Sequence, residues 1–274
     1  MTGNPDTSLT IDTHHHILPD FFWRETNDSH APIGGLAPLQ WSKEAMISFM
    51  DDAGIDVAVM SVSTPGVHLG DSEKARFLAR RCNEFAAELV HTRPDRFASF
   101  ACIPLPDIDA SLGELSYAVD VLRLDGLVLF TNSNGVYLAD AALEPVFQEL
   151  ERRGAVVFVH PNPSPDAAAH SLGLPDNLID FPTDTNRAVA QMHYTNRFAR
   201  TPNVKFLALC PVSRAVGRPV SYRTRDAPWP PNPESRQSLL NRSCCALCCL
   251  LDESSDSLWL RHIHGVAAFD LGHG

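Results

Sequence analysis

The stretch LTIDTHHH, residues 9–16, begins as an apolar strand and ends in three consecutive histidines. Alternate side chains of a strand point to the same side, so His14 and His16 are expected to face one way and His15 the other. Two imidazoles that converge at a strand end form a natural chelate for a metal ion. A chance cluster in a solvated loop is the alternative, but the histidines directly follow an apolar run. The stretch therefore predicts a first strand that delivers two metal ligands.

Short apolar runs alternate with longer segments of helical period from this strand to about residue 209. Near-continuous apolar strands that alternate with helices are typical of a parallel sheet covered by helices. The predicted strands are 9–14, 56–61, 96–103, 126–130, 155–159 and 204–209, and the predicted helices are 42–53, 72–91, 107–122, 140–152 and 183–199.

Several side chains inside these elements have specific expectations. Phe77 is predicted on the apolar face of its helix, and Cys82 and Cys102 are predicted in the core. The helix at 183–199 is expected to begin with Thr183 or Asp184 as its cap.

The polar ends of the predicted strands distinguish between two architectures. An open doubly wound sheet and a closed barrel both fit the alternation, but no GxGxxG turn follows the first strand. His160 ends the apolar fifth strand, just as the histidine cluster ends the first, and this placement is typical of the active face of a barrel. We therefore predict an α/β fold of the (β/α)8 barrel type, incomplete after the sixth strand.

His160 has two interpretations. A lone histidine at the end of a buried strand is usually a structural residue that finds a hydrogen-bond partner. Because a separate pair, His14 and His16, is predicted at the end of another strand of the same sheet, His160 becomes a candidate third metal ligand. Phe22, Trp23 and the loop at 131–137 are predicted near the same face, where an aromatic substrate would contact them.

Composition restricts the class of partner. The chain has 274 residues, 44% of them apolar, and a formal net charge of −11. This acidic balance argues against binding to nucleic acid or to anionic membranes, which requires a basic surface. The first ten residues are polar and show no signal peptide, and no run has the length of a membrane span, so a cytoplasmic enzyme is expected.

These residues also carry a resemblance to a known family. The segment 12–19 (DTHHHILP), the pair His160-Pro161 and the strand at 203–209 resemble the amidohydrolase superfamily, in its branch typified by aminocarboxymuconate semialdehyde decarboxylase. Residues 49–51, 58–67, 80–84 and 94–97 resemble, more narrowly, the fungal 6-methylsalicylate decarboxylases. The resemblance extends over residues 9–209.

The resemblance implies a site and a reaction. It implies a divalent metal, zinc first and manganese as the alternative, held by His14, His16, His160 and a late aspartate. The implied activity is nonoxidative decarboxylation of a small aromatic carboxylate with release of CO2. A hydrolase of the same superfamily, acting on a lactone or an amide, and a catalytically impaired barrel remain as alternatives.

The resemblance ends abruptly near residue 210. The family uses a histidine at the end of strand six, for acid–base chemistry or to orient the substrate, where this chain has Cys210. Asp270 lacks the context of the family's late aspartate. Proline, arginine and cysteine then replace the apolar alternation, including a CxxC at Cys245 and Cys248 that we interpret as non-specific. We predict one barrel domain over 1–274, with a family-like core at 9–209 and an aberrant, poorly ordered tail at 210–274.

The change at residue 210 suggests translation out of the family's reading frame, through a gene-model or splicing error. Without the two late residues, the chain is expected to have little decarboxylase activity. A barrel that stops after six strands also leaves an open edge, through which a homo-oligomer is expected to form.

Overall fold

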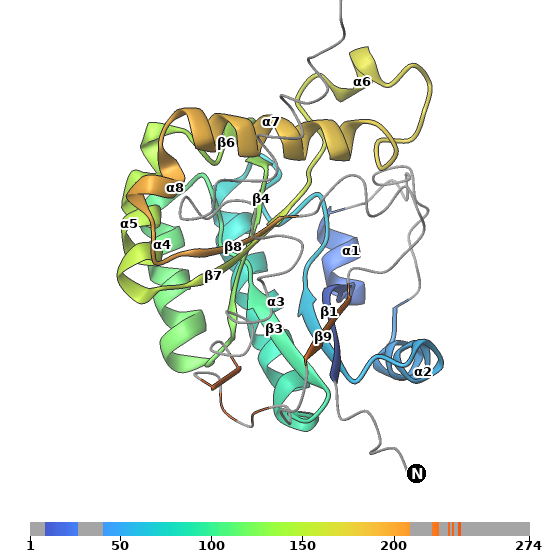
Figure 1. Ribbon diagram of the computed structural model, residues 1–274. Helices are drawn as coiled ribbons and strands as arrows, with labels where there is room; N and C mark the ends of the chain where they lie inside the picture. Colours follow the sequence, from blue (N-terminus) through green and yellow to red (C-terminus); the bar gives the residue numbers. More distant parts are fainter. Residues whose placement is uncertain are drawn as a thin grey trace, which may run out of the picture.

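The structure is a computed structural model that describes residues 9–26, 41–208 and 221–224, together with residues 230, 232, 235 and 236. Strands alternate with helices in the predicted order (Figure 1). The strands are β1 Leu9–His16, β2 Val57–Ser61, β3 Phe97–Ala101, β4 Gly126–Phe130, β5 Asn132–Ser133, β6 Val136–Tyr137, β7 Val156–His160, β8 Lys205–Ala208 and β9 Ser221–Thr224. The α-helices are α1 Asp20–Thr26, α2 Lys43–Ala53, α3 Ser72–Thr92, α4 Ile108–Ser116, α5 Glu144–Arg153, α6 Ala167–His170, α7 Asp180–Tyr194 and α8 Arg197–Arg200.

One sheet organises the described part of the chain, with the strand order β8-β7-β4-β3-β2-β1-β9. The strands from β1 to β8 in this sheet pair in parallel, and they curl into a half-barrel flanked by helices (Figure 1). This arrangement confirms the predicted barrel type that is incomplete after the sixth strand. A small antiparallel hairpin, β5 with β6, follows β4.

The buried strands have apolar side chains on both sides, as a parallel sheet requires. On β7, Val156 and Phe158 belong to one core cluster, and Val157 and Val159 belong to another, which also contains the apolar face of α5. Because side chains alternate along a strand, His160 lies on the same side as Phe158. The alternation therefore delivers His160 to the concave side of the curled sheet.

The helical boundaries follow local sequence signals at some ends and differ from the prediction at others. Ser42 caps α2 by accepting from the backbone N–H of Ala45, and Gly54 ends that helix with a φ of 65°, which a glycine adopts without strain. The predicted helix at 107–122 is α4 followed by one π-helical turn, Tyr117–Val121. The short 3-10 helix Ala141–Leu143 leads into α5.

Two expectations for single helical residues are wrong. Helix α7 begins at Asp180, one turn before the predicted caps Thr183 and Asp184, and the Asp184 side chain bonds other elements instead of the helix terminus. Phe77 is 61% exposed, since the buried stripe of α3 passes through the neighbouring Leu78. Cys82 and Cys102 are buried, as predicted.

A strand that the sequence did not signal lies in the C-terminal region. β9 pairs antiparallel with β1, with Leu9 opposite Thr224 and Asp12 opposite Ser221. The β1 edge of the sheet is therefore paired, whereas β8, within the described residues, pairs with β7 alone. The described helices include none that is long and apolar enough to cross a membrane.

Arg236 also connects the C-terminal region to the body of the fold. Its Nε donates to Oδ1 of Asp125 at 2.6 Å, and both side chains are almost fully buried. Asp125 lies just before β4, at the amino end of the sheet, and its Oδ2 accepts from the backbone N–H of Ser99. Burial raises the pKa of Asp125, and Arg236 opposes that rise.

Candidate metal centre

Three histidines from two distant strands meet on the concave side of the sheet. The Nε2 of His16 lies 3.0 Å from the Nε2 of His14 and 3.0 Å from the Nε2 of His160. The ligand atoms of the three side chains all lie within 4.8 Å of one another. The structure thus brings together the three predicted ligands, and His160 is almost fully buried.

A β-bulge in β1 places the carboxylate of Asp12 beside His15. Asp12 pairs with Ala58 and His15 with Met60, so β1 contains one more residue than β2 between these two pairs. Strict alternation would place Asp12 on the side of His14 and His16, but its carboxylate lies 3.0 Å from Nδ1 of His15 instead. The bulge thereby keeps this carboxylate with His15, on the side where the ring of His15 lies near Phe49 of α2.

The Asp12 carboxylate also fixes the backbone at the bulge. Its Oδ1 accepts from the backbone N–H of His14 at 2.9 Å, so one carboxylate holds the main chain of a candidate ligand and the ring of His15. Both Asp12 and His15 are buried. We infer that His15 has a structural role, as the alternation predicts.

Hydrogen bonds to the outer ring nitrogens orient two of the candidate ligands. The Nδ1 of His160 lies 2.7 Å from the backbone carbonyl of Pro161, and the Nδ1 of His16 lies 3.3 Å from that of Ser61. The Nδ1 of His16 also lies 3.3 Å from the hydroxyl of Ser61, which can donate to it. A carbonyl oxygen only accepts, so Nδ1 carries the hydrogen wherever the ring bonds a carbonyl group. In a neutral ring this tautomer leaves Nε2 as the acceptor, which is the atom that binds metals.

The donor chemistry of the cluster fits a cation. When His16 and His160 both donate through Nδ1, their Nε2 lone pairs face each other at 3.0 Å. A proton or a metal ion between the two atoms would satisfy both lone pairs. Three imidazoles with one position left open form the usual ligand set of a catalytic zinc site.

Aromatic side chains surround the histidines. The ring of Phe158 lies 5.3 Å from that of His14 and 5.8 Å from that of His160, and Phe130 lies 5.4 Å from His160. Both phenylalanines are buried. Their rings lower the local polarity and thereby strengthen electrostatic interactions at the site.

A buried carboxylate lies beside the loops that follow β4 and β7. Asp184 is fully buried and accepts from Thr131, Asn132, Tyr137 and Arg187. Burial and the hydrogen bond to Asp184 raise the pKa of Tyr137 to about 12, so its hydroxyl stays protonated at neutral pH. Nothing in the sequence pattern predicts this cluster beyond the polar character of its residues.

Other sequence predictions have different outcomes. Phe22, which is predicted near the active face, is fully buried and packs in the core. Cys210, Asp270 and the CxxC at Cys245 and Cys248 lie outside the described residues. Among the described residues, His14, His16 and His160 form the one cluster suited to a metal.

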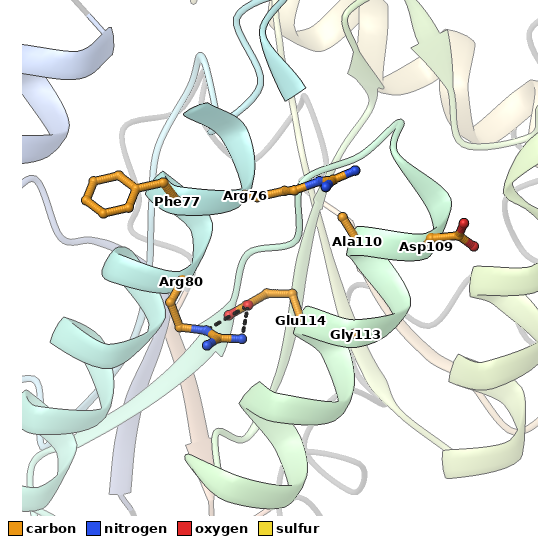
Figure 2. A pocket seen from close by; sticks show the side chains of 7 residues that line it. All are labelled: Arg76, Phe77, Arg80, Asp109, Ala110, Gly113 and Glu114. Atoms are coloured by element: carbon orange, nitrogen blue, oxygen red, sulfur yellow. Dashed lines mark hydrogen bonds and ion pairs between the residues drawn. The ribbon is translucent and has the colours of Figure 1, made fainter. Parts of the chain in front are cut away.

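A shallow hollow of about 530 Å³ lies between α3 and α4, on the outer helical layer (Figure 2). Its two arginines are already paired, Arg80 with Glu114 and Arg76 with Asp107. Burial raises the pKa of Glu114, although the hydrogen bonds from Asn83 and Arg80 oppose the rise. Because its charges are compensated, we assign no reaction to this hollow.

Comparison with known proteins identifies the family of this chain. Residues 11–208 match the amidohydrolase family, so the chain belongs to it. The decarboxylase yanB of Aspergillus niger is 36% identical over 208 residues, covering 72% of this chain and 56% of that protein. The 6-methylsalicylic acid decarboxylase of Penicillium expansum is 33% identical over 201 residues, covering 72% of this chain and 62% of its own length.

Solved structures show the same fold. A crystal structure of an amidohydrolase II has a TM-score of 0.68 and 30% identity, covering 72% of this chain and 65% of that one. A manganese-bound 5-carboxyvanillate decarboxylase from Novosphingobium aromaticivorans has a TM-score of 0.64 and 24% identity, covering 76% of this chain and 67% of that one. The matches cover about three fifths of the length of the curated relatives.

Proposed function

We propose that the centre formed by His14, His16 and His160 binds one divalent metal ion and supports nonoxidative decarboxylation of an aromatic carboxylic acid. The observation that carries the proposal is the convergence of three Nε2 atoms from β1 and β7, with the outer nitrogens of His16 and His160 placed against carbonyl groups. Zinc suits three imidazoles, and manganese is the alternative if a carboxylate completes the set.

The metal, when bound, would supply a positive centre that binds the substrate's carboxylate or phenolic oxygen and stabilises negative charge. The chain's own residues hold and orient this centre. Ser61 and Pro161 fix the rings of His16 and His160 through their carbonyl groups. Phe158 and Phe130 exclude water from one side of the histidines.

The reaction needs a proton at the ring carbon that bears the carboxylate. Protonation of that carbon interrupts the aromatic system, and cleavage of the bond to the carboxylate returns the electron pair to the ring as CO2 leaves. In the family, a histidine at the position of Cys210 serves acid–base chemistry or orients the substrate, and a late aspartate completes the metal site. We therefore propose slow turnover for this chain, because a thiol replaces the imidazole.

The substrate class follows from the relatives. Those matched over about 70% of this chain include fungal decarboxylases, two of them named for 6-methylsalicylic acid. A gamma-resorcylate decarboxylase of Rhizobium matches 54% of the chain at 30% identity. We propose a benzoate with an ortho hydroxyl group, since that oxygen and the carboxylate together offer two atoms to one metal.

The test measures CO2 release from 6-methylsalicylate and from 2,6-dihydroxybenzoate by the full chain loaded with Mn²⁺ or Zn²⁺. We expect slow, metal-dependent release that His14→Ala abolishes. His91→Ala is the matched control, because His91 is exposed on α3. CO2 release that persists in His14→Ala, or hydrolysis of an aryl lactone with no CO2 at all, would contradict the proposal.

A further inference from the structure

Asn162, two residues beyond His160, joins three loops at the carboxyl end of the sheet. The hydroxyl of Thr64 donates to its Oδ1, and its Nδ2 donates to the backbone carbonyl of Asn132 at 3.2 Å and, more weakly, to that of Pro65 at 3.5 Å. Thr64 and Asn162 are both buried. The loops that follow β2, β4 and β7 thus share one side chain.

The Thr64–Asn162 contact spans strands that are not neighbours. β7 and β2 are separated by β4 and β3 in the sheet. The two carbonyl groups beside Nδ2 settle the orientation of the amide, because the reversed amide would set an oxygen against two oxygens. The contact therefore bridges the concave mouth of the half-barrel in one defined geometry.

The same mouth must stay curled for the histidines to meet. β1 and β7 are four strand spacings apart in the sheet, or roughly 19 Å in a flat sheet at about 4.8 Å per spacing. The Nε2 atoms of His16 and His160 nevertheless lie 3.0 Å apart. A closed barrel fixes such curvature by pairing every strand, whereas the described strands form an open sheet with β8 and β9 at its edges.

Asn162 is itself held to the sheet beside His160. Its backbone N–H donates to Oγ1 of Thr131 at 3.0 Å, and the backbone N–H of Thr131 donates to the carbonyl of His160 at 2.9 Å. The Thr131 hydroxyl in turn donates to the fully buried Asp184 of α7. A displacement of Asn162 is therefore transmitted directly to the backbone that carries His160.

We propose that Asn162 and Thr64 are positioning residues for the metal centre: their bond across the mouth of the half-barrel holds β7 at the curvature at which His160 meets His16. Neither side chain needs to contact the metal or the substrate for this role. The inference rests on the proposed function, because metal affinity is the property that the bond would control.

Thr64→Val tests the inference, since it removes the hydroxyl and keeps the shape of the side chain. We expect the dissociation constant for Mn²⁺, measured from the electron paramagnetic resonance signal of the free ion, to rise about tenfold, as for residues that orient metal ligands. Thr64→Ser retains the hydroxyl and should restore the wild-type affinity. Thr201→Val is the matched control. Thr201 is also a buried threonine whose hydroxyl donates to a backbone carbonyl, but it lies just before β8, at the opposite end of the sheet.

A thermal melt of each metal-free variant separates positioning from plain stability. Thr64→Val and Thr201→Val should both lower the melting temperature, and only Thr64→Val should weaken Mn²⁺ binding. Equal affinity for Mn²⁺ in Thr64→Val and the wild type would overturn the inference and leave the metal site intact. A wild-type chain that binds no Mn²⁺ and no Zn²⁺ would overturn the proposed function, and the inference would fall with it.

Discussion

The two ends of the parallel sheet bury polar groups in opposite ways. At the amino end, Asp125 meets Arg236, and the negative charge has a positive partner at 2.6 Å. At the carboxyl end, the Nε2 atoms of His16 and His160 lie 3.0 Å apart. The first arrangement pairs opposite charges within the protein, whereas the second is the one for which we propose a bound metal ion.

The two ends differ in the role of their buried polar groups: the pair at the amino end serves stability, and the histidines at the carboxyl end form the proposed metal site. Buried charges that serve stability are paired, because an unpaired charge in the core costs several kcal/mol. Imidazole nitrogens that converge at one point can share a bound metal ion. In barrels of this type, the carboxyl ends of the strands form the reactive face, and the histidines lie at that end.

His160→Ala is expected to have the largest effect on this comparison. A structural zinc site with four ligands binds with about 10–16 kcal/mol, so one lost ligand costs about 3–4 kcal/mol, or a several-hundredfold weaker affinity. Isothermal titration with Zn²⁺ measures the loss. His193→Ala, on an exposed turn of α7, should bind like the wild type. Tight metal binding by His160→Ala would show that His160 is not a ligand of the proposed metal centre.

Arg236→Ala should come next, with an effect on stability. It leaves the buried Asp125 carboxylate without its partner, which costs about 3 kcal/mol of unfolding free energy in urea denaturation. Because burial raises the pKa of Asp125 above its usual 3.8, the remaining stability should be highest at low pH and fall as the pH rises past that value.

Asp125→Asn combined with Arg236→Ala is the control for that prediction. The amide oxygen can still accept from Ser99, and no buried charge remains. The double variant should therefore be more stable at neutral pH than Arg236→Ala alone. If Arg236→Ala leaves the free energy of unfolding unchanged, the buried pair between Asp125 and Arg236 does not exist in solution.

Glu114→Gln should have a moderate effect, dependent on pH. Burial raises the pKa of Glu114 above 4.5, so the folded protein holds this proton more tightly than the unfolded chain does. Its contribution to stability is thus complete below pH 4.5 and declines as the pH rises through the folded-state pKa. Melting curves from pH 3 to 8 should show a flatter pH dependence in Glu114→Gln, and an unchanged slope would contradict the account.

Glu149→Gln should have the smallest effect. The hydrogen bonds from Arg152 and Arg153 lower the pKa of Glu149 to about 2, so its contribution is present above pH 4.5 and is lost as the pH falls toward 2. The arginines are partly solvated, which limits the loss to about 0.2–1 kcal/mol at neutral pH. A loss of several kcal/mol in urea denaturation would contradict the small contribution expected for ion pairs near solvent.

Much of this architecture could be predicted from the chain itself. The alternation of apolar runs and helical periods predicted each parallel strand, and the spacing of His14 and His16 predicted their shared direction. His160 could be added because its strand ends at the same edge of the sheet. These features follow from periodicity, which is a local property of the sequence.

Other features depend on contacts between distant residues. The bulge in β1 adds one residue without a compositional mark, so the position of Asp12 beside His15 could not be predicted. Asp184 looked like a helix cap, but tertiary partners use its carboxylate. The sequence around β9 and Arg236 has no apolar period. β9 is positioned by pairing with β1, and Arg236 is positioned by its ion pair with Asp125.

The most direct test of the metal centre is X-ray absorption at the zinc edge of the zinc-loaded chain. The account predicts about three imidazole nitrogens at about 2.0–2.1 Å from the metal, reduced in number in His160→Ala. The alternative ligands are the cysteines after residue 209, which would give sulfur at about 2.3 Å. A shell of sulfur with no imidazole would contradict the assignment of His14, His16 and His160 as the metal site.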